Sequence, residues 1–307
     1  MEQAKENELG TKNVGKLLFS LALPAITAQI VNVLYNMVDR MFIGHIPEIG
    51  AQALTGVGLT FPIIMIISAF AALVSMGGAP RASIMMGQGK TDVAEKIMGN
   101  CTSALIIISV ILTAVIFIWC QPMLMAFGAS TNTIGYATEY IRIYACGTIF
   151  VQLAMGLNAF ITAQGFAKTS MLTVMLGAVI NIILDPILIF GLGMGVKGAA
   201  YATIISQGVS AGWVVLFLNG KKTNLKIKKE YLKIDKKVLL PCIGLGVSPF
   251  VMQATESLIA ICFNSSLLKY GGDLAVGSMT ILNSVMQFSM LPLMGLTQGA
   301  QPIISYN

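Results

Sequence analysis

The sequence is poor in charge. Only 10% of its 307 residues are Asp, Glu, Lys or Arg, whereas 56% are hydrophobic. A water-soluble globule needs more polar surface than this composition supplies, which argues against a soluble enzyme. The apolar residues gather into runs of about twenty or more, the length that a helix needs to cross roughly 30 Å of hydrocarbon. The chain is therefore predicted to be an all-α polytopic membrane protein.

Several features that would point elsewhere are missing. No segment has the spacing of a nucleotide-binding P-loop, so no ATP site is expected. The polar N-terminal stretch is not followed by a compact apolar core with a small-residue cleavage site, so we expect no cleaved signal. The only histidine, His45, falls in a predicted loop and is interpreted as a solvated residue rather than a pH sensor. The five cysteines lie in or beside apolar runs and are interpreted as packing residues without disulfides.

What is present is a series of eight predicted membrane helices. The predicted spans are 17–43, 53–76, 97–120, 138–163, 171–190, 198–218, 238–268 and 276 onward. With the N-terminus in the cytoplasm, fifteen of the nineteen Lys and Arg residues fall in inner segments. This bias predicts a multi-pass protein of the inner (plasma) membrane with a cytoplasmic N-terminus. It also explains the net charge of +6, so no nucleic-acid partner is expected.

The longest polar connection, residues 219–237, divides the chain. It carries eight lysines and is interpreted as a solvated cytoplasmic linker, with binding of anionic lipid as the alternative. Residues 1–218 before it form a predicted six-helix N-terminal bundle. A weak repeat follows it, because LALP from Leu21 is echoed by GVSP from Gly246. Residues 238–307 are therefore predicted to be the first two helices of a second, repeated bundle that is incomplete here.

Acidic residues inside the predicted spans are the candidates for chemistry, because a charge within a bilayer is costly. The four such acids are Asp39, Glu139, Asp185 and Glu256. Counting at 1.5 Å per residue from the flanking lysines places Asp39 and Asp185 at one depth, in the outer half of the membrane. The same count brings Tyr140 and Thr203 to that depth.

Asn181 strengthens this candidate site, since it precedes Asp185 by four residues and shares its helix face. Pro186 lacks an N–H and leaves the carbonyl of Ile182 without its helical partner. Carboxylates, an amide oxygen, hydroxyls and a free carbonyl are oxygen ligands suited to a small cation, and two acids could equally share a proton. We therefore predict a site for Na⁺ or H⁺, with Asp39, Asp185 and Asn181 as the candidate Na⁺ ligands.

Purely structural interpretations stand beside the functional ones. Asp39 could pair with Arg40, and Asp185 could form a hydrogen-bonded bend with its neighbours. A structural ion pair with Arg142, three residues on, is favoured for Glu139. Glu256 has no basic residue within one helical turn, and both a functional and a structural role remain open for it.

Several ordered motifs resemble the bacterial branch of the multidrug and toxic compound extrusion (MATE) family. The stretches that carry the resemblance are LALPAI from Leu21, NMVDRMFIG from Asn36, RASIMMGQG from Arg81, NIILDPILIFGLGMGVKGAAYAT from Asn181, and the terminal GAQPIISYN. The resemblance runs from residue 13 to residue 307. It implies two six-helix bundles around a cavity and export of organic cations in exchange for Na⁺ or H⁺ by alternating access.

The resemblance also implies site residues. The family's first-bundle cation site corresponds to Asp39, Asn181, Asp185, Tyr140 and Thr203, and Glu256 matches an acid credited with coupling in some members. Family chains continue beyond the motif at residue 307 into four more helices, so we expect this chain to be a fragment or a truncated product. A monomer in the lipid bilayer, without a cofactor, is expected.

Two other functions are alternatives to drug export. A lipid-linked saccharide flippase of the same superfamily would need a cluster of cations for its pyrophosphate cargo, and only Arg40 and Arg142 lie near the membrane interior. A membrane-embedded hydrolase could use the two aspartates as an acid/base dyad, but no nucleophile motif accompanies them. Efflux of cationic drugs is therefore the favoured prediction.

Overall fold

The protein is described by a computed structural model that covers residues 13–127, 129 and 131–307. Between residues 260 and 289 it describes the backbone and only a few side chains. The described chain contains helices and connecting segments and no strand. The helices are α2 (Val14–Gly44), α3 (Gly50–Gly87), α4 (Thr91–Ala126), α5 (Ile134–Cys146), α6 (Thr148–Ala163), α7 (Ala167–Pro186), η1 (Ile187–Gly191), α8 (Val196–Leu218), η2 (Lys229–Leu232) and α9 (Lys236–Tyr306).

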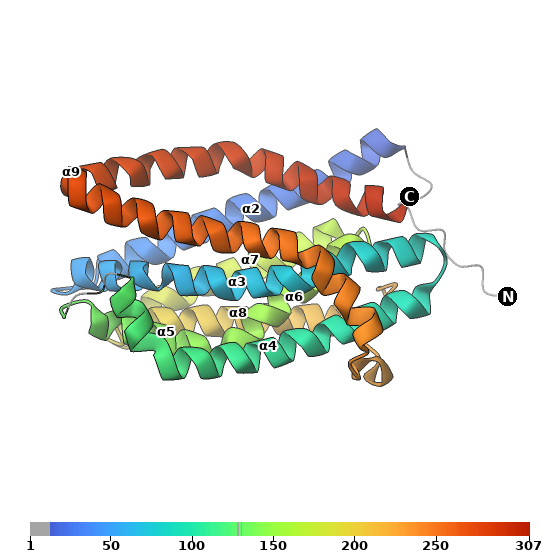
Figure 1. The fold of residues 1–307 in the computed structure, drawn as a ribbon, viewed down its shortest axis with the longest axis horizontal. Coiled ribbons are helices and arrows are strands. Elements are labelled where there is room, and N and C mark those ends of the chain that lie inside the picture. The colour runs from blue at the N-terminus through green and yellow to red at the C-terminus, as the bar shows by residue number, and fades with distance from the viewer. Residues whose placement is uncertain (1–12, 128, 130) are drawn as a thin grey trace.

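These helices run side by side along the long axis of the molecule (Figure 1). Among the described residues, six helices are long and apolar enough to cross a membrane, and the α5 and α6 pair makes a seventh span if it is counted as one. The prediction of an all-α polytopic membrane protein is confirmed. Large apolar side chains such as Phe19 (77% exposed) and Leu216 (74% exposed) remain on the outside, as expected where the solvent is lipid.

The fourth predicted span is broken rather than straight. It divides at Gly147 into α5 and α6, which meet at an angle of 58°. A Cβ at Gly147 would lie 2.5 Å from Ile204 of α8, so only glycine allows the bend to press against that helix. The bend lets α5 direct Tyr140 and Tyr144 toward the interior, where both side chains are buried.

Helix α9 reverses its direction. It contains 71 residues and would extend about 107 Å if it were straight. Both of its ends instead lie against α3, because the backbone of Cys242 contacts Gly77 and that of Tyr306 contacts Gly87. Figure 1 shows the two arms lying along α3 and α2. The seventh and eighth predicted spans leave a connection at 269–275, whereas the backbone there is helical and belongs to α9.

Glycines bring the two arms of α9 into direct backbone contact with the first bundle. Gly246 lies against the carbonyl of Leu73, and Gly77 lies against the carbonyl of Cys242. We call this pair of contacts the α3–α9 glycine crossing. Farther along, Gly299 contacts the backbone of Ala22 on α2. Small residues allow such close approach between membrane helices, where van der Waals packing drives association.

The connection between α8 and α9 is docked, which contradicts the expectation of a solvated linker. We call residues 223–235 the strap. Buried Gln164 accepts hydrogen bonds from the hydroxyl of Thr223 (2.9 Å), from the N–H of Asn224 (2.8 Å) and from the N–H of Leu225 (2.9 Å). The apolar side chain of Leu225 is fully buried. Composition alone does not predict this docking. The lysines indicate a solvated segment, but they alternate with residues that face inward.

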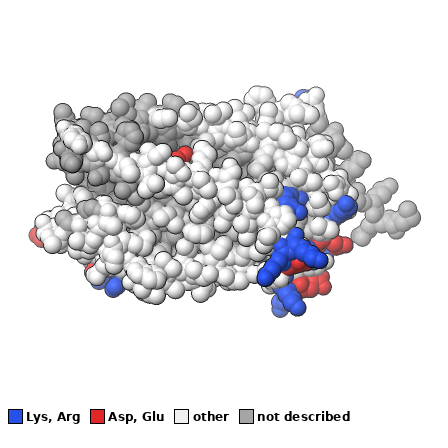
Figure 2. Space-filling view, viewed as in Figure 1, with Lys and Arg blue, Asp and Glu red and all other residues white. Residues whose placement is uncertain are grey.

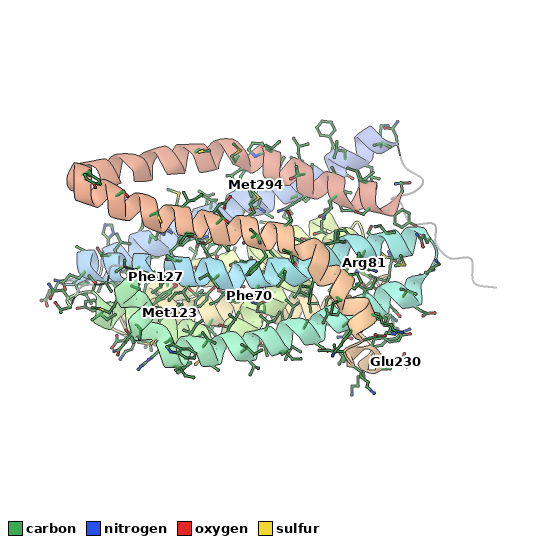
Figure 3. All side chains as sticks on the ribbon, in the orientation of Figure 1. Phe70, Arg81, Met123, Phe127, Glu230 and Met294 are labelled. Carbon is green, nitrogen blue, oxygen red and sulfur yellow. The ribbon has the colours of Figure 1, made fainter. Side chains whose placement is uncertain are left out.

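The second half of the strap is held along α4. Oδ1 of Asn100 accepts from the N–H of Asp235 (2.6 Å), and its Nδ2 donates to the carbonyl of Tyr231 (3.2 Å). The hydroxyl of Ser103 donates to the carbonyl of Leu232 (2.6 Å). These bonds satisfy backbone groups that would otherwise lack partners beside an apolar helix. Figure 3 shows Glu230 of the strap at the margin of the molecule and Arg81 of α3 farther inside.

Two ion pairs add to this docking. Lys96 lies 2.7 Å from Asp235, and this ammonium holds the pKa of the Asp235 carboxyl below its ordinary value. The hydrogen bond from Lys228 to Glu95, at 2.6 Å, raises the pKa of that lysine. The stability that the Lys96–Asp235 pair contributes is lost only as the pH falls through the pKa of Asp235. The stability that the Lys228–Glu95 pair contributes is lost only as the pH rises through the raised pKa of Lys228. Both pairs therefore persist at neutral pH.

Candidate functional site

Helices α2 and α7 bring the two predicted aspartates together inside the bundle. Asp185 is fully buried and Asn181 is 1% exposed. The amide Nδ2 of Asn181 donates to Oδ1 of Asp185 at 3.4 Å, as their spacing of four residues on one helix predicts. The carboxyl group of Asp39, from α2, lies within hydrogen-bonding reach of the carboxyl group of Asp185. The structure thus joins two acids that are far apart in the sequence.

Three oxygens of this cluster have no hydrogen-bond partner in the described structure. They are Oδ1 of Asp39, Oδ1 of Asn181 and Oδ2 of Asp185, and all three are buried. A buried acceptor without a donor costs about 1–3 kcal/mol, more when it is charged. A proton on one carboxyl or a small cation between the oxygens would remove this cost. The donor set therefore fits a monovalent cation, with two carboxylates and one amide oxygen as ligands.

Hydroxyl groups from α5 and α8 border the cluster. The side chains of Tyr140 and Thr203 lie close to each other, and Tyr140 lies close enough to Asp39 for the two to interact electrostatically. The hydroxyl of Thr203 also donates to the carbonyl of Ala199 at 3.0 Å. The ring of Tyr144 stacks beside that of Tyr140, with centroids 6.2 Å apart.

Tyr35 belongs to the same cluster and was missed in the sequence. It lies one turn before Asp39 on α2 and interacts electrostatically with both Asp39 and Asp185. The spacing of four residues that identified Asn181 would have identified Tyr35 as well. A tyrosine in an apolar span gives a weaker signal than an acid, because its hydroxyl carries no charge that the bilayer makes costly.

The helix continues beyond Pro186 in a wider form. Residues Ile187–Gly191 make a π-turn, in which the N–H of Leu192 donates to the carbonyl of Ile187 at 2.9 Å. Such π-turns often occur at functional sites. The proposed role of the Ile182 carbonyl as a ligand remains a prediction.

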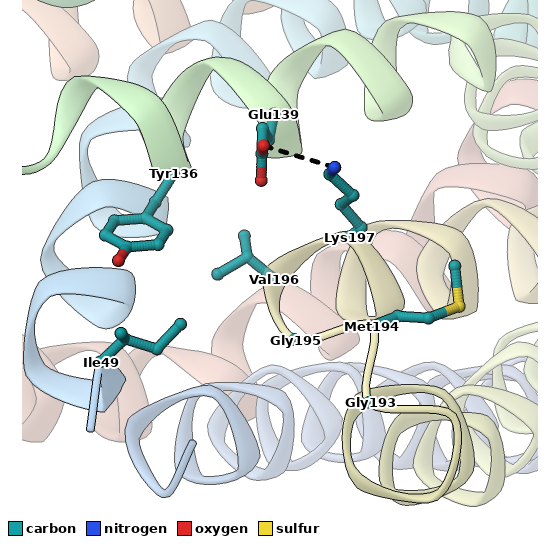
Figure 4. A pocket seen from close by; sticks show the side chains of 8 residues that line it. All are labelled: Ile49, Tyr136, Glu139, Gly193, Met194, Gly195, Val196 and Lys197. Carbon is teal, nitrogen blue, oxygen red and sulfur yellow. Dashed lines mark ion pairs between the residues drawn. The ribbon is translucent and has the colours of Figure 1, made fainter. Parts of the chain in front are cut away.

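Glu139 has a different partner from the one expected. It pairs with Lys197 at 3.4 Å, not with Arg142, because α5 faces the start of α8 at this point. Its side chain is 47% exposed, so it is not a buried membrane acid. The pair borders a pocket of about 360 Å³ that is lined by Ile49, Tyr136, Glu139, Gly193, Met194, Gly195, Val196 and Lys197 (Figure 4).

The remaining candidates lie outside the cluster. Glu256 is exposed on α9 and takes no part in the contacts given for Asp39 and Asp185. Arg40 places its guanidinium over the ring of Phe61, 5.5 Å from the centroid. Of the six predicted site residues, Asp39, Asn181, Asp185, Tyr140 and Thr203 are therefore close together, and Glu256 is not.

Comparisons with known proteins point in one direction. The MatE family matches residues 24–187. Multidrug export protein MepA of Staphylococcus haemolyticus (strain JCSC1435) is 28% identical over 295 residues, which cover 96% of this chain and 65% of that protein. MepA of Staphylococcus aureus (strain NCTC 8325 / PS 47) is 27% identical over 299 residues, which cover 96% of this chain and 64% of that protein. The chain thus spans less than two thirds of the length of these curated relatives.

Solved structures agree. The MATE multidrug transporter DinF-BH is 37% identical with a TM-score of 0.91, and the match covers 99% of this chain and 68% of that one. An outward-facing conformation of a multidrug resistance MATE family transporter of the MOP superfamily is 26% identical with a TM-score of 0.89, covering 99% of this chain and 67% of that one. Sequence and fold are therefore similar to those of multidrug transporters over nearly the whole chain.

Proposed function

Because this chain belongs to the multidrug and toxic compound extrusion (MATE) family, we propose that it provides the ion-binding part of a transporter that exports cationic drugs in exchange for H⁺ or Na⁺ by alternating access. Its family consists of transporters rather than enzymes, so the hydrolase interpretation is set aside. The protein is multi-pass and lies in the plasma membrane. The exchanged ion, the cargo and a monomeric state are parts of this proposal.

One observation carries the proposal: the buried oxygens of Asp39, Asn181 and Asp185 that lack partners. Two carboxyl groups within reach of each other repel when both are ionised, and a proton or a cation relieves this repulsion. Binding of the coupling ion and binding of a cationic drug would then compete for the same negative charge. Such competition makes an antiporter, because release of the ion accompanies uptake of the cargo.

Charge also favours a cationic cargo over a lipid-linked saccharide. The described interior presents acids and tyrosines around Asp185, whereas Arg40 and Arg142 are both exposed. A pyrophosphate group would meet no cluster of cations there. Aromatic rings such as those of Tyr140 and Tyr144 can instead face an organic cation.

The direct test measures ion-driven export. Cells that express a transporter containing this chain should expel ethidium. Collapsing the gradient of the coupling ion should stop the efflux, with a protonophore if the ion is H⁺ and by removal of Na⁺ if it is Na⁺. Radioactive Na⁺ bound to the purified protein in nanodiscs, or a proton released on ethidium binding, identifies the ion. Efflux that continues when both gradients are absent would contradict the proposal.

The orientation is tested separately. In a variant without native cysteines, labels at Lys90→Cys and Lys229→Cys should react only from the cytoplasmic side, and a label at Glu48→Cys only from outside. The charge bias predicts this arrangement, and Figure 2 shows the visible Lys and Arg atoms gathered mainly at the end that carries the strap. Reaction of the Glu48→Cys label from the cytoplasm would reverse the proposed topology.

A further inference from the structure

We infer that the strap presents a binding surface for the headgroups of anionic phospholipids. The surface consists of exposed lysines on a segment that is fixed against the flank of α4. Its members are Lys221, Lys222, Lys226, Lys229, Lys233 and Lys236, the first two lying just before the strap and the last just after it. We call this set the basic strap surface. The inference requires neither the proposed cargo nor the proposed coupling ion.

The strap lies against the side of α4. Tyr231 and Leu232 are held by Asn100 and Ser103, which follow the first residue of α4, Thr91, by more than two turns. A Cβ at Gly99 would lie 2.7 Å from the carbonyl of Tyr231, so the backbone of the strap touches the side of α4. The strap therefore runs beside the beginning of the apolar span, not beneath the helix ends. Figure 1 shows this segment, in orange-brown, projecting outside the bundle next to α4.

That position is the depth of lipid headgroups. The charged start of α4, with Asp92, Glu95 and Lys96, gives way to uncharged and mainly apolar residues from Ile97 onward. A segment that lies level with this change faces the region between water and hydrocarbon. The strap has the mixed composition suited to that region, because Ile234 is 39% exposed and Tyr231 and Leu232 are half-buried among the lysines.

The lysines of the basic strap surface carry charge that the described ion pairs do not use. Three of the four acids near the strap are paired, since Asp235 is engaged by Lys96, and Glu95 and Asp92 by Lys228, whereas Glu230 within the strap is exposed. Within the described part of the chain, no member of the basic strap surface makes an ion pair. Six lysines stand against the one exposed acid of the strap, so the surface keeps a net positive charge.

The backbone of the strap is fixed in place by hydrogen bonds. Gln164, Glu95 and Asn100 hold the strap backbone at three places, so the lysines project from an ordered segment. Less conformational entropy is lost on binding than with a flexible linker. Several ordered ammonium groups at headgroup depth favour phosphatidylglycerol over a zwitterionic lipid, by about fivefold for each lysine close to the surface.

The test compares lipids and matched variants. Native mass spectrometry of the detergent-solubilised protein should show phosphatidylglycerol retained in preference to phosphatidylcholine, with the preference falling as salt rises. The triple variant Lys226→Gln, Lys229→Gln, Lys233→Gln should lower phosphatidylglycerol binding roughly tenfold or more. It leaves Lys96 and Lys228, which hold the strap, unchanged.

Two controls make the result specific. The triple variant Lys16→Gln, Lys90→Gln, Lys168→Gln removes the same charge from exposed positions elsewhere at the basic end and should keep most of the binding. Replacing the three strap lysines with Arg preserves charge and should restore the preference. Equal retention of both lipids, or equal loss in both glutamine variants, would overturn the inference.

Discussion

Cells that express a transporter containing this chain with Asp185→Asn should lose ion-driven efflux of ethidium, and so should cells in which the chain carries Asp39→Asn. Each change removes one negative charge from the buried cluster with little change in volume. The negative charge for which ion and drug compete is then lowered, so the ion no longer drives the exchange. Efflux should fall to the level of cells without the protein, and Na⁺ or proton binding to the purified variants should fall with it.

Three comparisons sharpen this result. Membrane expression should stay normal, because a neutral side chain inserts more readily than an acid. The double variant should be no worse than either single one, since both residues serve one site. Glu139→Gln removes an acid that is half-exposed and paired with Lys197, so its effect should be mild. Efflux at the parental rate in both aspartate variants would make these residues structural.

The second large effect is expected at the α3–α9 glycine crossing. A methyl group at Gly246 would run into the carbonyl of Leu73, and one at Gly77 into the carbonyl of Cys242. Backbone atoms cannot move aside as a flexible side chain can, so α9 must shift away from α3. Gly246→Ala should lower the free energy of unfolding by about 1–3 kcal/mol or more. Thermal unfolding of the protein in detergent measures this loss.

Gly244→Ala is the matched control. It lies two residues away on the same helix, and nothing is within 4 Å of its Cβ position. Alanine also favours a helix over glycine by about 0.8–1 kcal/mol, so this variant should be neutral or slightly more stable. If Gly244→Ala and Gly246→Ala unfold at the same temperature, the close backbone contact at the crossing is not part of the folded protein.

The sequence allowed the membrane class and the grouping of Asp39 with Asp185 to be predicted, because both follow from length and from depth along a helix. It did not allow the docking of the strap to be predicted. That docking depends on Gln164 and Asn100 facing a segment far along the chain. The partner of Glu139 was missed for the same reason, since Arg142 is near in sequence but Lys197 is near in space.

The bend at Gly147 also could not be predicted from the sequence. An apolar run indicates a helix but does not show where a neighbour such as Ile204 approaches closely enough to require glycine. Tyr35 is a different case, because its position one turn before Asp39 was available from the sequence. The residues that sequence reasoning missed are thus mostly those whose role depends on tertiary contacts.

The attachment of the strap to α4 has a consequence for synthesis in the cell. The side chain of Asn100 donates to the carbonyl of Tyr231, which lies 131 residues later in the chain. A ribosome needs roughly 7–26 s to add these residues. During that interval the amide of Asn100 has the carbonyl of Lys96, 2.9 Å away on its own helix, as its acceptor. Helix α4 therefore passes through a more polar form before the strap is made. The first bundle reaches its final state only after the chain that follows it has left the ribosome.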